Sequence, residues 1–326
     1  MKLASIHTGQ PDGQLVVVSR DTKTFCRVGS PLSTMASCLE NWDSAVPVLQ
    51  DIYQQLNDGA CGDAESTESV TFLAPLPRSY QWLDGSLFMN HGHLMQQAFH
   101  LDPIEGADKY PLVYQGAGDA FTGCNDDIAV YDVAHGADFE GEFGVLTTAL
   151  PAGASKEQAL NAIRLIVQLN DISYRGLAPR EMKTGFGFVQ AKGATAFAPF
   201  AVTPDELGDA WQNGRVNLTL NIKRSGEWFG TLSGSEMHFG FHELIAHACV
   251  ARPVNAGTVF GSGTVSNANP EAGQACIAEL RAKELIRDGK PATAFLQPGE
   301  TVEMVCNDAN GKTLFGTISQ TVSGGQ

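Results

Sequence analysis

Long apolar runs and positive charge are both scarce in this sequence of 326 residues. The longest unbroken aliphatic run spans only Leu15 to Val18, far short of the roughly 20 residues that cross a bilayer as a helix. Basic residues number 21 against 36 acidic ones, and the resulting net charge of −15 repels phosphate backbones and anionic lipids. We therefore expect no membrane span and no nucleic-acid binding, and an anionic substrate must meet a local group of Arg and Lys side chains.

Cysteine spacing of the kind that marks zinc ribbons or disulfide frameworks is also missing. The seven cysteines are odd in number, scattered, and never arranged as Cys-x-x-Cys. The first residues, MKLASIHTGQPDG, lack the apolar segment of a signal peptide. We therefore predict reduced thiols in a cytoplasmic protein.

The chain is long enough for about two domains or one large one. Pro75 and Pro77 mark a soft boundary between a small amino-terminal domain, residues 1–77, and a larger domain, residues 78–326. In the first part, LVVVSR and SVTFLAP look like strands, and apolar residues at helical spacing predict a helix from Ser44 to Leu56. The 35 glycines and 15 prolines favour a turn-rich mixed β fold over a helical bundle.

Two further helices are predicted in the larger part. The string SKEQALNAIRLIVQLND, residues 155–171, opens with a capping box of Ser155 and Gln158 and continues with an apolar stripe. The second helix spans Phe241 to Val250 and ends before Pro253. It contains His242 and His247, whose five-residue spacing places the imidazoles about 140° apart, so a shared zinc ion is unfavourable.

A row of acidic residues in ADFEGEFGVLTTAL carries the clearest chemical signal. Side chains alternate along a strand, so Asp138, Glu140 and Glu142 fall on one face, with Phe139 and Phe143 on the other. Three carboxylates on one face repel each other, and a hard cation such as Mg²⁺, Mn²⁺ or Ca²⁺ relieves that repulsion. A solvated face of an edge strand is the alternative that spacing alone leaves open.

Two more strings add acids and histidine to this picture. Asp171 lies at the end of the predicted helix 155–171, where a carboxylate opposes the macrodipole and needs either a cation or Arg175 to compensate it. Asp84 precedes His91 by seven residues in an aromatic stretch, a natural pairing of metal ligand and general base. A structural histidine is the alternative reading of His91.

Taken in order, these strings resemble the fumarylacetoacetate hydrolase (fumarylacetoacetase) family over most of residues 78–318. The resemblance implies a divalent metal bound by Asp84, Glu140, Glu142 and Asp171, the last within NDISYR. It implies His91 as general base with Glu243 as its partner, and Lys192 as a catalytic lysine. It also implies substrate contacts from Tyr114, Arg175 and Thr264.

The fold implied by the resemblance is α+β and predominantly β: a mixed β-roll catalytic domain behind a small β-rich amino-terminal domain, assembled as a homodimer. The implied activity is metal-dependent hydrolysis of the carbon–carbon bond of an anionic β-diketo acid, of fumarylacetoacetate or acylpyruvate type, in aromatic-compound or tyrosine breakdown. Mg²⁺ is the first expectation, with Mn²⁺ or Ca²⁺ as alternatives. The same scaffold hosts oxaloacetate decarboxylases or tautomerases and sugar keto-acid dehydratases, and a silent protein with a structural Ca²⁺ is a third reading.

Two positions depart from the better-known members. This chain has His100 where animal fumarylacetoacetases carry a second substrate-binding Arg, and Ala178 where they carry a Gln. Those residues hold the ends of the substrate in these relatives, so the departures put the substrate in doubt more than the reaction scaffold.

Overall fold

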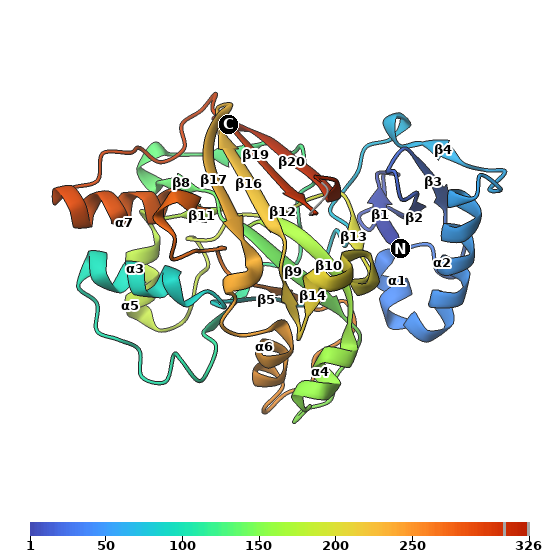
Figure 1. Cartoon of the computed structure of the whole chain (residues 1–326), viewed down its shortest axis with the longest axis horizontal. Helices are drawn as coiled ribbons and strands as arrows, with labels where there is room; N and C mark the ends of the chain where they lie inside the picture. Colours follow the sequence, from blue (N-terminus) through green and yellow to red (C-terminus); the bar gives the residue numbers. More distant parts are fainter. Residues whose placement is uncertain (309–310, 325–326) are drawn as a thin grey trace.

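The computed structural model describes residues 1–308 and 311–324 (Figure 1). Its amino-terminal part contains four strands and two helices: β1 (Lys2–Ile6), β2 (Gln14–Val18), β3 (Thr24–Arg27), β4 (Glu65–Ser66), α1 (Met35–Glu40) and α2 (Trp42–Asn57). Helix α2 confirms the helix predicted from Ser44, and β2 confirms the strand in LVVVSR. The string SVTFLAP forms no strand, because only Phe72 makes a single β-bridge, to Ile6.

Two of the cysteines in this part are joined, so the prediction of reduced thiols is wrong for them. Cys26 in β3 and Cys61, in the loop after α2, form a disulfide. They are 35 residues apart in sequence, and only the folding of that loop against β3 brings them together. The other five cysteines are free, as predicted, and the structure buries all five.

The rest of the chain contributes the remaining elements. The strands are β5 (Trp82–Gly85), β6 (Val113–Gly116), β7 (Ile128–Val130), β8 (Ala137–Asp138), β9 (Gly141–Thr147), β10 (Ile163–Asn170), β11 (Ser173–Tyr174), β12 (Ala196–Phe197), β13 (Ala201–Val202), β14 (Trp211–Gln212), β15 (Arg215–Val216), β16 (Thr219–Arg224), β17 (Glu227–Ser233), β18 (Val259–Gly261), β19 (Thr301–Asn307) and β20 (Thr313–Gly324). The helices are α3 (Met89–Phe99), α4 (Lys156–Ala162), α5 (Ala178–Thr184), α6 (Phe241–Ala248) and α7 (Ile277–Asp288).

One large mixed sheet crosses the whole molecule. Its order is β4-β3-β2-β1-β13-β10-β9-β18-β5-β6, with β12 also paired to β10. A second sheet, β17-β16-β19-β20-β7, packs against it through a shared core that includes Phe143, Leu220 and Met304. The architecture confirms the expected α+β fold with a mixed β-roll. Figure 1 shows the amino-terminal part at one end and α3, α5 and α7 gathered at the other.

The predicted helix 155–171 is half wrong. The capping box of Ser155 and Gln158 is present and opens α4, but α4 ends at Ala162 and the chain continues as β10. The segment after Ala162 is rich in β-branched residues and lies in the middle of the large sheet, between β9 and β13, where nearly every residue is buried. Asp171 therefore follows a strand, and the macrodipole argument does not apply to it.

Helix α6 confirms the helix predicted from Phe241, although it ends two residues earlier, at Ala248. Within the described residues, none of the helices is both long and apolar enough to cross a membrane.

Candidate active site

Three buried carboxylates meet where inner strands of the large sheet end. Asp84, Glu142 and Asp171 each offer an oxygen, and these oxygens all lie within 4.8 Å of one another. Their side chains are at most 4% exposed. Neither oxygen of Glu142 has a hydrogen-bond partner among the described residues. A buried carboxylate without donors is costly, so this donor set fits a hard divalent cation.

Strand pairing explains why these acids converge. Glu142 lies on β9, opposite Leu169 of β10, and Asp171 comes directly after β10. Asp84 lies on β5, which runs parallel to β18. Within this strand pair, Asp84 is opposite Gly261. Since β10, β9, β18 and β5 are neighbours in that order, acids far apart in the sequence reach the same point.

Burial and mutual repulsion raise the pKa of two of these acids, Asp84 and Glu142. Burial, followed by the negative charge of Asp171, raises the pKa of Asp84 to about 8. Burial and the charge of Asp84 raise the pKa of Glu142 well above its usual range. Without a cation, the folded protein therefore holds protons on Asp84 and Glu142 near neutral pH.

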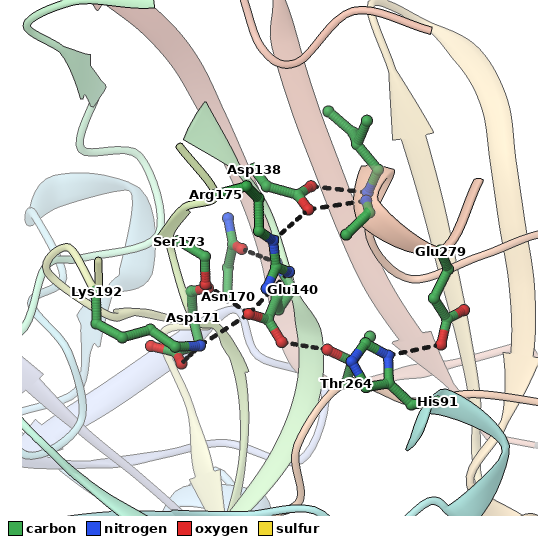
Figure 2. A network of polar contacts seen from close by, with 12 residues as sticks. His91, Asp138, Glu140, Asn170, Asp171, Ser173, Arg175, Lys192, Thr264 and Glu279 are labelled. Atoms are coloured by element: carbon green, nitrogen blue, oxygen red, sulfur yellow. Dashed lines mark hydrogen bonds and ion pairs between the residues drawn. The ribbon is translucent and has the colours of Figure 1, made fainter. Parts of the chain in front are cut away.

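Glu140, the fourth predicted ligand, lies beside this group but is surrounded by donors (Figure 2). Its oxygens accept hydrogen bonds from Ser173 (2.5 Å), Lys192 (2.8 Å) and Thr264. Burial acts to raise its pKa, but the charges of Arg175 and Lys192 outweigh burial and hold the pKa below the ordinary value. Glu140 is thus a fixed anion on the wall of the site.

Lys192 links Glu140 to the three-carboxylate group. Its ammonium lies 2.6 Å from Asp171 and 2.8 Å from Glu140, and 5.0 Å from the centre of the Tyr114 ring. Burial favours the neutral amine, but Asp171 and Glu140 raise the pKa of Lys192 above its normal value, so the lysine stays charged. Tyr114, opposite Asp84 across the β5–β6 pair, donates its hydroxyl to Asp171 at 2.5 Å.

The histidine predicted as general base has a different partner from the expected one. His91 Nδ1 lies 2.8 Å from Glu279 Oε1, and Glu279 is 1% exposed on α7. The predicted partner Glu243 instead caps α6 at the Gly240 N–H and pairs with Lys156 (2.8 Å) and Arg215 (3.2 Å). The expected pairing of His91 with Glu243 is therefore wrong.

Asp138 also leaves the role that strand alternation suggested. The predicted strand is interrupted, because β8 ends at Asp138 and β9 begins at Gly141. The Asp138 carboxylate faces the amino terminus of α7, where it accepts hydrogen bonds from the Ile277 and Ala278 N–H groups at 2.7 and 2.9 Å. It also accepts from Arg175 Nε at 2.9 Å. Arg175 in turn pairs with Glu140 at 3.0 Å. Asp138 thus connects α7, the helix that contains Glu279, to Arg175 at the wall of the carboxylate site (Figure 2).

A cavity of about 740 Å³ opens onto these groups. Most of the predicted site residues line it, namely Asp84, His91, Tyr114, Glu140, Arg175, Lys192 and Thr264. Glu142 and Asp171 are not lining residues themselves, but their oxygens lie within 4.8 Å of an oxygen of Asp84, which does line the cavity. Glu243 is not among the lining residues. Ala178 lines the cavity, and His100 is an exposed residue with φ of 51° at the end of α3.

Comparison with known proteins shows the family of this chain. Residues 82–323 match the model of the fumarylacetoacetate hydrolase C-terminal domain, and residues 1–78 match that of fumarylacetoacetase N-terminal domain 2. A 2,4-didehydro-3-deoxy-L-rhamnonate hydrolase from Sphingomonas sp. (strain SKA58) is 24% identical over 216 residues, which cover 65% of this chain and 65% of that protein.

Solved structures show the same fold along the whole chain. Maleylpyruvate hydrolase from Sphingobium sp. SYK-6, in complex with manganese(II) and pyruvate, has a TM-score of 0.66 at 14% identity and covers 100% of both chains. The 2-hydroxyhepta-2,4-diene-1,7-dioate isomerase from Mycobacterium marinum has a TM-score of 0.61 at 17% identity and covers 99% of this chain and 98% of its own. Because the C-terminal domain model alone matches well over half of the sequence, the chain belongs to the fumarylacetoacetate hydrolase family.

Proposed function

We propose that the protein is a divalent-metal-dependent hydrolase that cleaves the carbon–carbon bond between two carbonyls of a β-diketo acid. The observation that carries this proposal is the position of the His91–Glu279 pair. Its histidine lines the same cavity as Asp84 and Lys192 of the carboxylate site, and Glu279 holds that histidine from behind. Hydrolysis needs both an activated water and stabilisation of an enolate, and the two groups supply one each.

The metal ligands in this proposal are Asp84, Glu142 and Asp171, with Glu140 at their side. A divalent cation bound there would act as a Lewis acid toward the oxygens of the substrate's keto-acid end. Mg²⁺ is the proposed ion, with Mn²⁺ and Ca²⁺ as alternatives, because all three take carboxylate oxygens. The maleylpyruvate hydrolase complex, which contains manganese(II) and pyruvate, supports placing a keto-acid end at these carboxylates.

His91 is the proposed general base. Glu279 holds its Nδ1 and favours the tautomer in which Nε2 accepts a proton from water. The water oxygen then bonds to the acyl carbonyl carbon, the carbon–carbon bond breaks, and the electron pair of that bond passes to the enolate. His91 then returns the proton to the enolate carbon, which completes the reaction. Base assistance of this kind contributes about 10²- to 10⁴-fold in rate.

The remaining side chains position charge. Lys192 supplies a fixed positive charge close to the carboxylates, where negative charge develops on the substrate oxygens. Tyr114 and Thr264 line the cavity with hydroxyl groups, and Arg175, held between Asp138 and Glu140, contributes local positive potential for an anionic substrate.

The test is loss of enol ultraviolet absorbance from 2,4-diketo acids, fumarylacetoacetate and fumarylpyruvate among them, with Mg²⁺, Mn²⁺, Ca²⁺ or EDTA. Metal-dependent cleavage of at least one acid supports the proposal. Oxaloacetate, followed by release of pyruvate, is the counter-substrate: fast turnover of oxaloacetate with every diketo acid untouched moves the protein to the decarboxylase alternative.

The cellular setting and assembly are part of the same proposal. A β-diketo acid hydrolase of this type acts in the breakdown of aromatic compounds, and the family resemblance favours a homodimer. The mass of the protein in solution, measured by light scattering during gel filtration, tests the assembly.

A further inference from the structure

The cavity is lined by charged side chains of the carboxylate site and also by a set of apolar side chains. The apolar set includes Met95 and Phe99 of α3, Leu112, Met182 of α5, and Phe188. We call these five residues the apolar wall. Phe188 packs edge-on against Tyr114 with ring centres 5.4 Å apart, so the wall begins directly beside the carboxylate site.

The apolar wall offers no hydrogen-bond donor to a second anionic group of a substrate. Ala178 and Met182, one turn apart on α5, present a methyl group and a thioether to the cavity, and neither donates a hydrogen bond. His100 is exposed at the end of α3 and is not among the described lining residues. A carboxylate placed against these two side chains would gain no hydrogen bond from them, whereas an alkyl or aryl group would bury apolar surface against them.

Two cations do reach the cavity, from other positions. Arg281 of α7 already donates to the Thr293 carbonyl and lies over the Phe295 ring, 4.4 Å from its centre. Lys183 is on α5, exposed to solvent. Both cations line the same cavity as the apolar wall, so the comparison of a dicarboxylate with a monocarboxylate of equal length tests whether either one binds a second carboxylate.

From this wall we propose that the substrate is a β-diketo acid whose acyl group is an apolar alkyl or aryl chain, not a chain that ends in a carboxylate or carries several hydroxyl groups. This inference rests on the proposed function. Water adds to the acyl carbonyl, the carbon–carbon bond breaks, and the products are the apolar carboxylic acid and a 2-keto acid. Hydroxyl groups against Met and Phe side chains would lack partners, which disfavours sugar-derived acids.

Binding tests the proposal without relying on catalysis. Calorimetric titration of the Mn²⁺-loaded protein with 2-oxobutanoate, 2-oxohexanoate and 2-oxooctanoate measures how affinity grows with chain length. Each added methylene that reaches the wall should tighten binding about three- to fourfold. The matched dicarboxylate 2-oxosuberate, equal in length to 2-oxooctanoate, should bind at least tenfold more weakly.

Variants locate the effect on the wall. Met182→Arg places a cation on α5 and should reverse the preference toward 2-oxosuberate, whereas Met182→Leu should retain the wild-type preference. Met182 is 62% exposed, so both substitutions are compatible with folding. Phe186→Ala is the matched control, because Phe186 belongs to the following loop, is 97% exposed and does not line the cavity.

The outcomes separate the two proposals. Equal affinity along the chain-length series, or tighter binding of 2-oxosuberate by the wild type, overturns the apolar-acyl inference whatever the enzyme does. Chain-length-dependent binding with no cleavage of 2,4-dioxooctanoate or benzoylpyruvate supports the inference but contradicts the hydrolase proposal. Cleavage of both, faster than that of fumarylpyruvate, supports the two together.

Discussion

His91 is the residue on which the proposed chemistry depends most directly. It contacts Glu279 and lines the cavity, but it is not part of the three-carboxylate group. We expect His91→Ala to lower kcat by about 10²- to 10⁴-fold, the usual contribution of a general base, while calorimetry shows Mn²⁺ binding unchanged. Loss of metal binding along with turnover would instead identify His91 as a ligand.

Glu279 and Glu243 form a matched pair of test positions. Glu279→Gln keeps a hydrogen-bonding side chain at His91 but removes its charge, so we expect kcat to fall roughly 10- to 100-fold, as for other groups that orient a functional histidine. Glu243→Gln should leave kcat unchanged and alter the free energy of unfolding by less than about 1 kcal/mol, because Glu243 pairs with partly exposed cations. Equal effects of the two substitutions on kcat would contradict the assignment.

At the residue scale, the family resemblance selected Asp84, Glu142, Asp171 and Lys192, which the fold brings together. Strand alternation in ADFEGEF grouped Asp138 with the two glutamates, whereas the structure turns Asp138 to the amino terminus of α7. Glu279 was not predicted as a site residue. Its only local signal is that it lies in the first turn of the amphipathic helix 277–288, and this helix was not predicted from the sequence. Its contact with His91 spans 188 positions and depends on how α7 packs against α3.

At the scale of elements, Asp138 connects the amino terminus of α7 to Arg175. Its burial raises its pKa, against the opposing charge of Arg175. Asp138→Asn would weaken charge-assisted hydrogen bonds, and we expect a loss of about 1.5–3 kcal/mol in the free energy of unfolding, measured with urea. Activity should fall as well, since α7 carries Glu279. Asp288→Asn, at the exposed far end of α7, should change neither quantity.

Element prediction failed at β10 for a reason that periodicity cannot detect. An apolar run that is buried on both faces satisfies a helical stripe and a central strand equally well. The capping box settled only where α4 begins. The choice of strand for Ile163–Asn170 comes from pairing with β9 and β13, which are contacts of the folded chain.

At the scale of the whole molecule, the large sheet unites segments that the sequence separates. The boundary predicted between residues 77 and 78 is crossed by this sheet, because β1 pairs with β13 far along the chain. Sequence composition marks a change of segment at such a point, but it carries no information about which strands will be neighbours. The α+β class and the two-part plan were predictable, whereas the strand order that assembles the site was not.

Metal binding and pH should be coupled through the stability of the whole fold. The pKa of Asp84 rises from 3.8 in the unfolded chain to about 8, and that of Glu142 shifts in the same direction. The folded state therefore holds protons that the unfolded chain releases above pH ~4. This contribution to stability is complete below pH ~4 and is lost as pH rises through 8, with a slope of up to about 1.4 kcal/mol per pH unit for each proton.

A cation competes with those protons, so its stabilising effect should grow over the same range. We expect the Tm in excess EDTA to fall between pH 5 and 9, and the gap between Mn²⁺ and EDTA curves to widen. Glu140 shifts in the opposite direction and affects stability only at more acidic pH. Asp84→Asn removes one of the titrating acids and should flatten the EDTA curve. Parallel curves with a constant gap would mean that the buried acids are not where the cation binds.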